Sequence, residues 1–276
     1  MTHRASALIS AQEWFSAGER VGYDAERPGI NPRSPLRAFI RRAAGTGVTR
    51  TFLPGWPDGS YGWAKVEAFL SSRFHFPRIY LDYIGHGDSD KPRDYPYSTF
   101  ERADLVEALW HAEGIAQTVV VAFDYSCIVS LPLLTSPLGA AITPIGQRSW
   151  RMFAPFLRPV FSRGYPLSAA EMKELHDAIS RRDGVRVLPA TAGFVDEHRE
   201  HAARWDLARI ISALGDEVAF GVVGSAEDPF EGEQLRLARE RLADSVEITE
   251  LAGGHLTTAE QPDRLAEVIA ALPERS

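Results

Sequence analysis

Hydrophobic and polar positions follow two different periods along the chain, and their alternation predicts an α/β protein. Short, almost continuous apolar runs, such as residues 118–123 (Thr-Val-Val-Val-Ala-Phe), are typical of strands buried on both faces. Longer stretches, such as residues 99–114, space their apolar side chains three and four positions apart, which is typical of amphipathic helices. The expected strands are residues 20–24, 36–44, 48–54, 78–83, 118–123, 218–224 and 246–251. The expected helices are residues 62–74, 99–114, 168–183, 193–214, 234–243 and 258–272.

The order of these elements predicts a mostly parallel sheet with helices on both faces, because parallel strands need crossover connections. Residues 137–214 interrupt the alternation with mainly helical sequence, in which only residues 141–145 suggest a further strand. In open α/β sheets, ligands bind at the carboxyl ends of the strands. We therefore expect residues 137–214 to form a helical cap over that edge, and residues 1–136 and 215–276 to form the core.

Composition narrows the class of protein. The chain has 276 residues, of which 45% are hydrophobic and 24% are charged, so it can bury a large core. The net charge of −7 argues against a nucleic-acid partner, and no apolar run reaches the ~18 residues of a membrane span. The single cysteine, Cys127, excludes an intramolecular disulfide and a multi-cysteine metal site. Residues 1–24 lack the apolar core of a signal peptide, and we predict a cytoplasmic protein.

The turn after residues 118–123 carries the first candidate for chemistry. Ala122 and Ser126 lie two positions to either side of Asp124, and small residues at this spacing are typical of a sharp turn that exposes a nucleophile. A carboxylate at this position can attack carbon and form an ester intermediate. The alternative interpretation is that Asp124 only caps the helix that follows.

Two further residues follow strands in the order of an acid and a base. Asp228 comes after the expected strand 218–224, and His255 lies in a glycine-containing loop after strand 246–251. Nucleophile, acid and histidine in this order are typical of a hydrolytic triad on an α/β fold. We therefore expect Asp228 to orient His255, with the neighbouring Glu227 as the second candidate for that role.

The loop after residues 48–54 is the expected source of oxyanion stabilisation. In this kind of turn, one backbone N–H group comes from that loop and another from the residue after the nucleophile. Here these are the N–H groups of Trp56 and Tyr125. The indole of Trp56 either donates a hydrogen bond to a leaving group or packs beneath the cap.

Several short motifs carry a resemblance to a known superfamily. They are Ala11-Gln12-Glu13-Trp14-Phe15, Pro54-Gly55-Trp56-Pro57, Gly85-His86-Gly87-Asp88-Ser89-Asp90-Lys91-Pro92, Ala122-Phe123-Asp124-Tyr125-Ser126, Gly254-His255 and Glu260-Gln261-Pro262. With these motifs the chain resembles the α/β-hydrolase superfamily over nearly its full length. Within it, the chain is most similar to the aspartate-nucleophile branch, which contains epoxide hydrolases, haloalkane dehalogenases and mesoderm-specific-transcript-like proteins.

The resemblance implies a two-step hydrolysis of a small apolar organic substrate by water, without cofactor or metal. Asp124 attacks a carbon atom of an epoxide or haloalkane, and His255, held by Asp228, activates the water that cleaves the ester. In the epoxide hydrolases that this chain resembles, cap tyrosines protonate the leaving oxygen, and Tyr165 is the expected acid here. Tyr125 stands where dehalogenases usually have tryptophan, which favours an epoxide over a halide.

Departures from the family pattern leave other functions open. Pro54-Gly55 replaces the usual His-Gly, and Phe123-Asp124-Tyr125-Ser126 replaces the usual His-Asp-x-Gly. The stretch after the turn is also short, so we expect a reduced sixth strand. The alternatives are a binding protein that kept the fold and a non-hydrolytic enzyme that uses the same pocket. His198 and His201 lie about one helical turn apart, but no third metal ligand is evident.

Overall fold

The computed structural model describes residues 9–24, 35–93, 95–127, 158–202, 207–214, 221–228, 232–242 and 246–272. Among these residues, the strands form a five-stranded sheet and a two-stranded sheet. The strands are β1 (Glu19–Tyr23), β2 (Leu36–Ala43), β3 (Thr49–Leu53), β4 (Arg78–Leu81), β5 (Thr118–Ala122), β6 (Gly221–Gly224) and β7 (Glu247–Glu250).

The strand order of the larger sheet is β1-β2-β4-β3-β5. Strands β1, β2 and β4 pair antiparallel, whereas β3 runs parallel to both β4 and β5, and β6 runs parallel to β7. Parallel strands point their carboxyl ends to one edge of a sheet. The candidate site residues lie in loops that directly follow the parallel strands.

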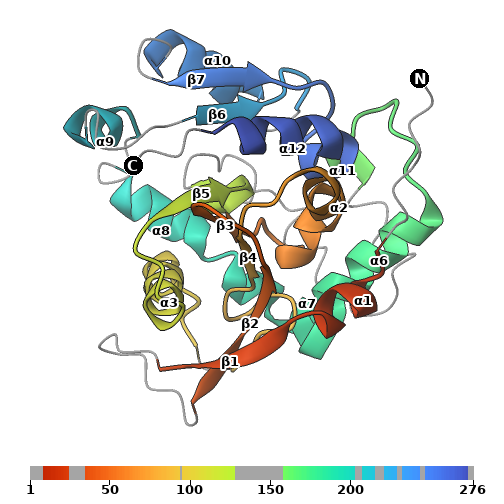
Figure 1. Cartoon of the computed structure of the whole chain (residues 1–276), viewed down its shortest axis with the longest axis vertical. Helices are drawn as coiled ribbons and strands as arrows, with labels where there is room; N and C mark the ends of the chain where they lie inside the picture. The colour runs from red at the N-terminus through yellow and green to blue at the C-terminus, as the bar shows by residue number, and fades with distance from the viewer. Residues whose placement is uncertain are drawn as a thin grey trace.

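Helices cover both faces of the larger sheet. In Figure 1, α3 lies on one side of β3 and β5, and α2 and α12 lie on the other, while α10 lies against β6 and β7. The helices are α1 (Ala11–Ser16), η1 (Ser60–Trp63), α2 (Ala64–Arg73), α3 (Thr99–Ala112), η2 (Asp124–Cys127), η3 (Arg158–Val160), α6 (Ala169–Ser180), η4 (Arg181–Asp183), α7 (Gly184–Thr191), α8 (Phe194–His201), α9 (Leu207–Leu214), α10 (Gly232–Leu242), α11 (Thr257–Glu260) and α12 (Pro262–Ala271).

Successive strand residues point to opposite faces and so build two apolar layers. On one face, Phe39, Phe52 and Tyr80 pack with residues of α2 and α12. On the other face, Ile40 and Leu81 pack with residues of α3. Burying each such side chain stabilises the fold by roughly 1.5–3 kcal/mol, so the two layers fix the sheet between the helices.

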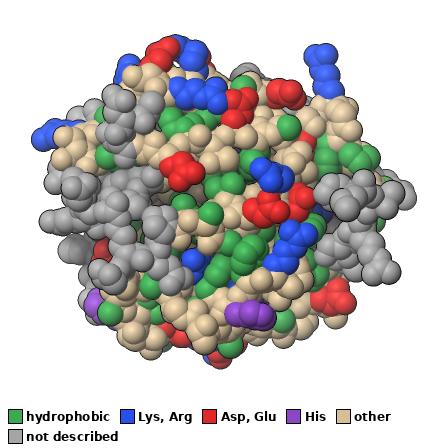
Figure 2. All heavy atoms as spheres, turned by 45° about the horizontal axis from the view of Figure 1, so that its top comes forward, with side chains coloured by type: hydrophobic (Ala, Val, Ile, Leu, Met, Phe, Trp, Pro, Cys, Tyr) green, Lys and Arg blue, Asp and Glu red, His purple; other side chains and the backbone are tan. Residues whose placement is uncertain are grey.

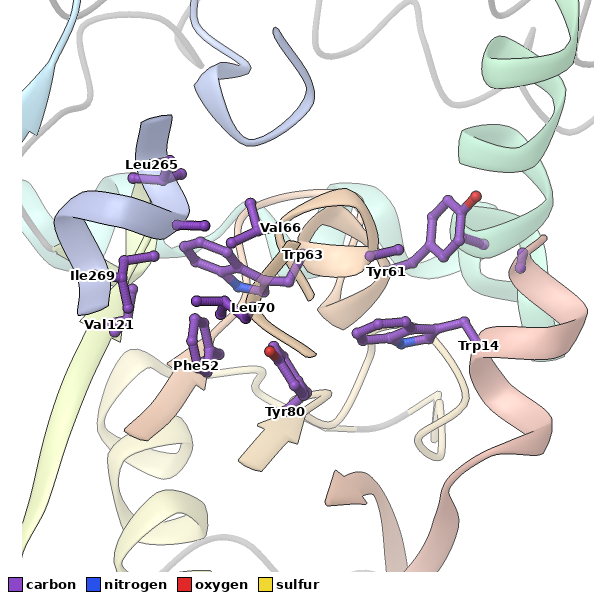
Figure 3. Close-up of a cluster of buried hydrophobic side chains, with 14 of the residues drawn as sticks. Trp14, Phe52, Tyr61, Trp63, Val66, Leu70, Tyr80, Val121, Leu265 and Ile269 are labelled. Atoms are coloured by element: carbon purple, nitrogen blue, oxygen red, sulfur yellow. The ribbon is translucent and has the colours of Figure 1, made fainter. Parts of the chain in front are cut away.

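Trp63 connects this core to the turn that follows β5. Its ring centroid lies 5.2 Å from that of Phe52 and 5.9 Å from that of Phe123, and its indole N–H donates to the Leu53 carbonyl at 3.1 Å. Figure 3 shows the Trp63 ring between Leu265 of α12 and Phe52 of β3. Because Phe123 directly precedes Asp124, its contact with Trp63 fixes the turn to the hydrophobic core.

The structure confirms the predicted α/β class with its mostly parallel sheet, and it corrects several element boundaries. The predicted helix 258–272 is divided into α11 and α12, because Pro262 begins a new helix and forces Gln261 out of helical geometry. The predicted helix 193–214 is also divided, since α8 ends at His201 and α9 begins at Leu207. Helix α7 was not predicted because Pro189 lies inside it, and proline normally interrupts helices.

Some predictions lie partly or wholly beyond the described residues. The candidate strand 141–145 lies outside them, and only the parts 158–202 and 207–214 of the expected cap are described. These parts are mainly helical, as expected. The cap boundaries therefore remain a prediction, and residues 158–202 are called the helical segment below.

Charges of both signs are mixed on one face of the molecule (Figure 2). On the face shown in Figure 2, acidic and basic side chains lie beside one another and neither sign forms a separate patch. Arg236 of α10, for example, pairs with both Glu233 and Glu240. Within the described part of the chain, no helix is both long and apolar enough to cross a membrane.

Candidate active site

Asp124 lies in a strained turn at the carboxyl end of β5. Its φ angle of 54° is in the left-handed region, which residues other than glycine rarely adopt outside sites that need it. The loop after β3 packs directly on this turn, because a Cβ atom at Gly55 would lie 3.1 Å from the Asp124 Cβ and 2.7 Å from the Phe123 ring. The Ser126 hydroxyl donates to the Pro54 carbonyl at 2.6 Å and ties the two loops together.

The structure brings Asp124, His255 and Asp228 together. His255 Nε2 lies 3.2 Å from Asp124 Oδ1, and His255 Nδ1 lies 3.0 Å from Asp228 Oδ2. The three side chains are largely buried, with exposed fractions of 14% for Asp124, 11% for His255 and 5% for Asp228. With its Nδ1–H donating to Asp228, the imidazole presents Nε2 to Asp124, which is the geometry that a general base needs. Glu227, the second candidate acid, is exposed instead.

The backbone of Trp56 holds the other oxygen of the candidate nucleophile. The Trp56 N–H donates to Asp124 Oδ2 at 2.8 Å. This N–H is therefore placed where negative charge on that oxygen is stabilised. The indole of Trp56 points elsewhere, because its Nε1–H donates to Thr191 Oγ1 of α7 at 3.0 Å. Of the two interpretations of this side chain, the structure supports packing beneath the helical segment.

Tyr125 supports the turn through its side chain. The ring is buried, lies 5.8 Å from the His86 ring in a stacked arrangement, and has the Arg102 guanidinium 4.8 Å from its centroid. Burial keeps His86 neutral, because it lowers the pKa of that imidazole well below its usual value. Tyr125 therefore places its backbone beside Asp124 from a packed aromatic cluster.

The hydroxyl of Tyr165, the predicted acid, lies in a hydrogen-bonded cluster with Lys65 and Glu171. Its hydroxyl donates to Glu171 Oε1 at 2.6 Å and accepts from Lys65 Nζ at 2.5 Å. Burial and the hydrogen bond to Glu171 raise the pKa of the Tyr165 hydroxyl, which makes proton release harder. The phenol is thus engaged in an ion cluster, and its proton faces Glu171.

Asp58 is a buried carboxyl that the sequence pattern did not indicate as a site residue. It is 5% exposed, and its Oδ1 atom has no hydrogen-bond partner among the described residues. Burial and then the negative charge of Asp124 raise its pKa to about 7, against the opposing influence of His255. The only sequence signal was an acidic residue two positions after Trp56, in a loop at the carboxyl edge of the sheet.

The remaining titratable candidates lie in structural settings. Asp82 accepts the backbone N–H groups of Ser60 at 2.6 Å and Asp88 at 2.9 Å, and so joins the loop after β3 to the loop after β4. His201 packs its ring against Phe100. No group of three metal-ligating side chains occurs among residues that the structure describes.

Comparison with known proteins agrees with this geometry. A family model described as "Alpha/beta hydrolase family" matches residues 52–268. The chain belongs to this family. As an α/β hydrolase, it has the expected place for a nucleophile, which is the turn after β5 where Asp124 lies.

Individual relatives cover much of the chain at modest identity. LipZ of Mycobacterium tuberculosis (strain CDC 1551 / Oshkosh), which is named as a hydrolase, is 26% identical over 95% of this chain and 98% of its own length. The mesoderm-specific transcript homolog protein of Homo sapiens is 29% identical over 55% of this chain and 57% of its own length.

Solved structures show the same fold at lower identity. Cfl2 of Burkholderia cenocepacia has a TM-score of 0.66 at 22% identity and covers 92% of this chain and 95% of its own. A Vigna radiata epoxide hydrolase mutant has a TM-score of 0.59 at 14% identity over 92% and 98%. An Exiguobacterium antarcticum esterase has a TM-score of 0.65 at 14% identity over 86% and 95%.

Proposed function

We propose that this α/β hydrolase cleaves an epoxide through a covalent ester on Asp124. The observation that carries the proposal is the contact pattern of one carboxylate: the Trp56 N–H binds its Oδ2 and the His255 imidazole lies 3.2 Å from its Oδ1. A residue that only capped a helix would not need His255 beside its second oxygen. His255 is in turn held by the buried Asp228.

In the first step, one oxygen of Asp124 attacks a ring carbon of the epoxide. The new C–O bond forms as the ring C–O bond breaks, and the electron pair of that bond goes to the departing oxygen, which takes up a proton. The Trp56 N–H holds the carboxylate in place during the attack, so the reacting oxygen is already oriented. Proximity of this kind lowers the barrier without any change in the chemistry.

In the second step, water attacks the carbonyl carbon of the ester. His255 Nε2 takes one proton from the water, and the resulting imidazolium is stabilised by Asp228. The negative charge that develops on the carbonyl oxygen is received by the N–H groups of Trp56 and Tyr125. When the tetrahedral intermediate collapses, the imidazolium returns a proton to the departing alkoxide, and the diol is released. Asp124 is left as a carboxylic acid, and its proton passes back to the acid that protonated the epoxide oxygen.

The leaving group decides between an epoxide and a halide. A halide needs free indole or amide donors, but the Trp56 indole donates to Thr191, and a tyrosine follows the nucleophile. An epoxide needs a proton for its departing oxygen. We assign this role to Asp58, which is buried and has no hydrogen-bond partner for its Oδ1 among the described residues, and whose pKa is raised to about 7 by burial and then by the charge of Asp124. These two features favour an epoxide.

The test is turnover of an epoxide panel in water enriched in heavy oxygen. Because water attacks the ester carbonyl, the label enters the Asp124 side chain over several turnovers and is found by peptide mass spectrometry. We expect Asp124→Asn to lose turnover by about 10³-fold or more, and His255→Gln to accumulate the esterified protein. Wild-type turnover by Asp124→Ala, or tight epoxide binding without product, would overturn the proposal, and the second result would indicate a binding protein.

A further inference from the structure

The loop that carries His255 is held by a carboxylate of the next helix. Glu260 Oε1 accepts the backbone N–H of Gly254 at 3.1 Å and that of Ser162 at 2.8 Å, and Glu260 Oε2 accepts the Ser162 hydroxyl. Gly254 and Ser162 are far apart in the sequence. Glu260 therefore joins the histidine loop to the start of the helical segment.

The helical segment also contacts His255 directly. The His255 backbone N–H donates to the Val160 carbonyl at 2.8 Å. The Arg158 guanidinium braces this part of the segment, because it donates to the carbonyls of Phe161 at 3.3 Å and Ser162 at 3.0 Å. Residues 158–162 thus present a fixed row of backbone groups to the histidine loop.

The approach of the two backbones is very close. A Cβ atom at Gly254 would lie 2.6 Å from the Ser162 nitrogen and 2.7 Å from the Val160 oxygen, so glycine is required there. On the opposite side, the buried Ser225 hydroxyl, from the loop that carries Asp228, donates to the Gly253 carbonyl. The loop that carries His255 is therefore held from two sides.

We propose that Glu260 is a positioning residue that fixes His255 by seating residues 158–162 on its loop. The inference rests on the proposed function, and it assigns Glu260 to one half of the reaction. Ester formation needs Asp124, its backbone donors and a proton for the departing oxygen, but not the imidazole, whereas ester hydrolysis needs the imidazole aligned with the water. Loss of the Glu260 contacts therefore slows hydrolysis and leaves ester formation nearly unchanged.

Three substitutions separate geometry from charge at this position. Glu260→Ala removes every contact, and we expect hydrolysis to fall by roughly 10–100-fold, because displacement of a catalytic group by about 1 Å has such an effect. Glu260→Asp is one methylene too short and gives a similar loss. Glu260→Gln keeps one oxygen for both N–H groups and turns its amide toward the Ser162 hydroxyl, so it restores most of the rate.

The matched control is Glu267→Ala on α12, an exposed residue that pairs only with surface arginines among the described contacts. The control should leave both half-reactions unchanged. The rates of ester appearance and disappearance are measured by rapid quenching and intact-protein mass. Equal slowing of both steps in Glu260→Ala, or a Glu260→Gln enzyme no better than Glu260→Ala, would overturn the inference.

A second readout does not depend on turnover. The His255 Nδ1–H that donates to Asp228 should give a downfield proton resonance in wild-type protein, which broadens in Glu260→Ala through faster exchange with water. Ser162→Ala, which removes one contact only, should broaden it less. An unchanged resonance in Glu260→Ala contradicts the positioning role, even if no epoxide is turned over and the proposed function fails.

Discussion

At the residue scale, Asp58 adds a buried titratable carboxyl to the site. It is buried near Asp124 and His255, with which it interacts electrostatically, and its pKa of about 7 means that it loses its proton near neutral pH. Above that pH the site gains a further buried negative charge, which interacts with that of the candidate nucleophile. Its protonation state therefore links the stability of the protein to pH.

We expect Asp58→Asn to stabilise the protein at alkaline pH. The pKa of this carboxyl is about 7 in the folded protein, against an ordinary value of 3.8, so the folded state binds the proton more tightly between these values. The free energy of unfolding of the wild type therefore falls as pH rises through this range, by an amount on the order of 4 kcal/mol. The neutral amide lacks this loss.

Urea unfolding at pH 5 and pH 8 measures the effect. The difference in the free energy of unfolding between pH 5 and pH 8 should be smaller in Asp58→Asn than in the wild type. It should equal that of the wild type in Asp196→Asn, whose side chain is 87% exposed. An unchanged difference in Asp58→Asn would show that Asp58 is already ionised at pH 5.

At the scale of elements, the site depends on a backbone contact between η3 and the loop after β7. Gly254→Ala places a methyl group within 2.6–2.8 Å of backbone atoms of residues 160–162, which cannot move independently of one another. We expect the free energy of unfolding to fall by about 1–3 kcal/mol and the Tm to fall by roughly 2–10 °C. Ester hydrolysis should fall more than ester formation.

Thermal unfolding followed by circular dichroism provides the measurement. Gly22→Ala in β1 is the control, because a Cβ atom there meets nothing within 4 Å. Its Tm should match that of the wild type. Equal Tm values for both variants would mean that the two backbones are further apart than the structure shows.

At the scale of the whole molecule, one lysine joins the core to the helical segment. Lys65 of α2 forms an ion pair with Glu171 of α6, donates to the Tyr165 hydroxyl and lies 3.4 Å from the Ala259 carbonyl of α11. Burial alone would raise the pKa of Glu171, but hydrogen bonds from Lys65 and Tyr165 outweigh it and lower that pKa. The cluster thus stabilises the folded state above the unfolded pKa of Glu171, and this stability is lost as pH falls.

Lys65→Met should loosen the helical segment. The substitution removes the Lys65 hydrogen bond and charge from the partly buried Glu171 carboxylate. We therefore expect the free energy of unfolding to fall by about 1–3 kcal/mol at pH 7. Limited proteolysis should cut residues 158–202 faster than in the wild type. Lys173→Met, which removes an exposed pair with Asp177 on the same helix, should leave the cleavage rate unchanged, and equal rates for both variants would argue against the connection.

The sequence was informative where the signal was local. The apolar run of β5, the small residues around Asp124 and the positions of Asp228 and His255 after strands were all readable from the chain, and the structure brings these three side chains together. The role expected for Tyr165 came from resemblance alone. It stays a prediction, and the partners of the phenol in the structure, Lys65 and Glu171, come from α2 and α6, which the sequence alone does not place beside it.

The sequence by itself determined the α/β class, the order of the elements and the positions of Asp124, Asp228 and His255 in turns after strands. Periodicity and turn composition are properties of neighbouring residues, so they can be recognised without a structure. Only the tertiary structure decided that Asp58 is buried beside Asp124, that the Trp56 indole is taken by Thr191, and that Glu260 holds the histidine loop. These features depend on burial and on contacts between residues far apart in the chain. Burial and long-range contacts form only when the chain folds and its distant segments pack together.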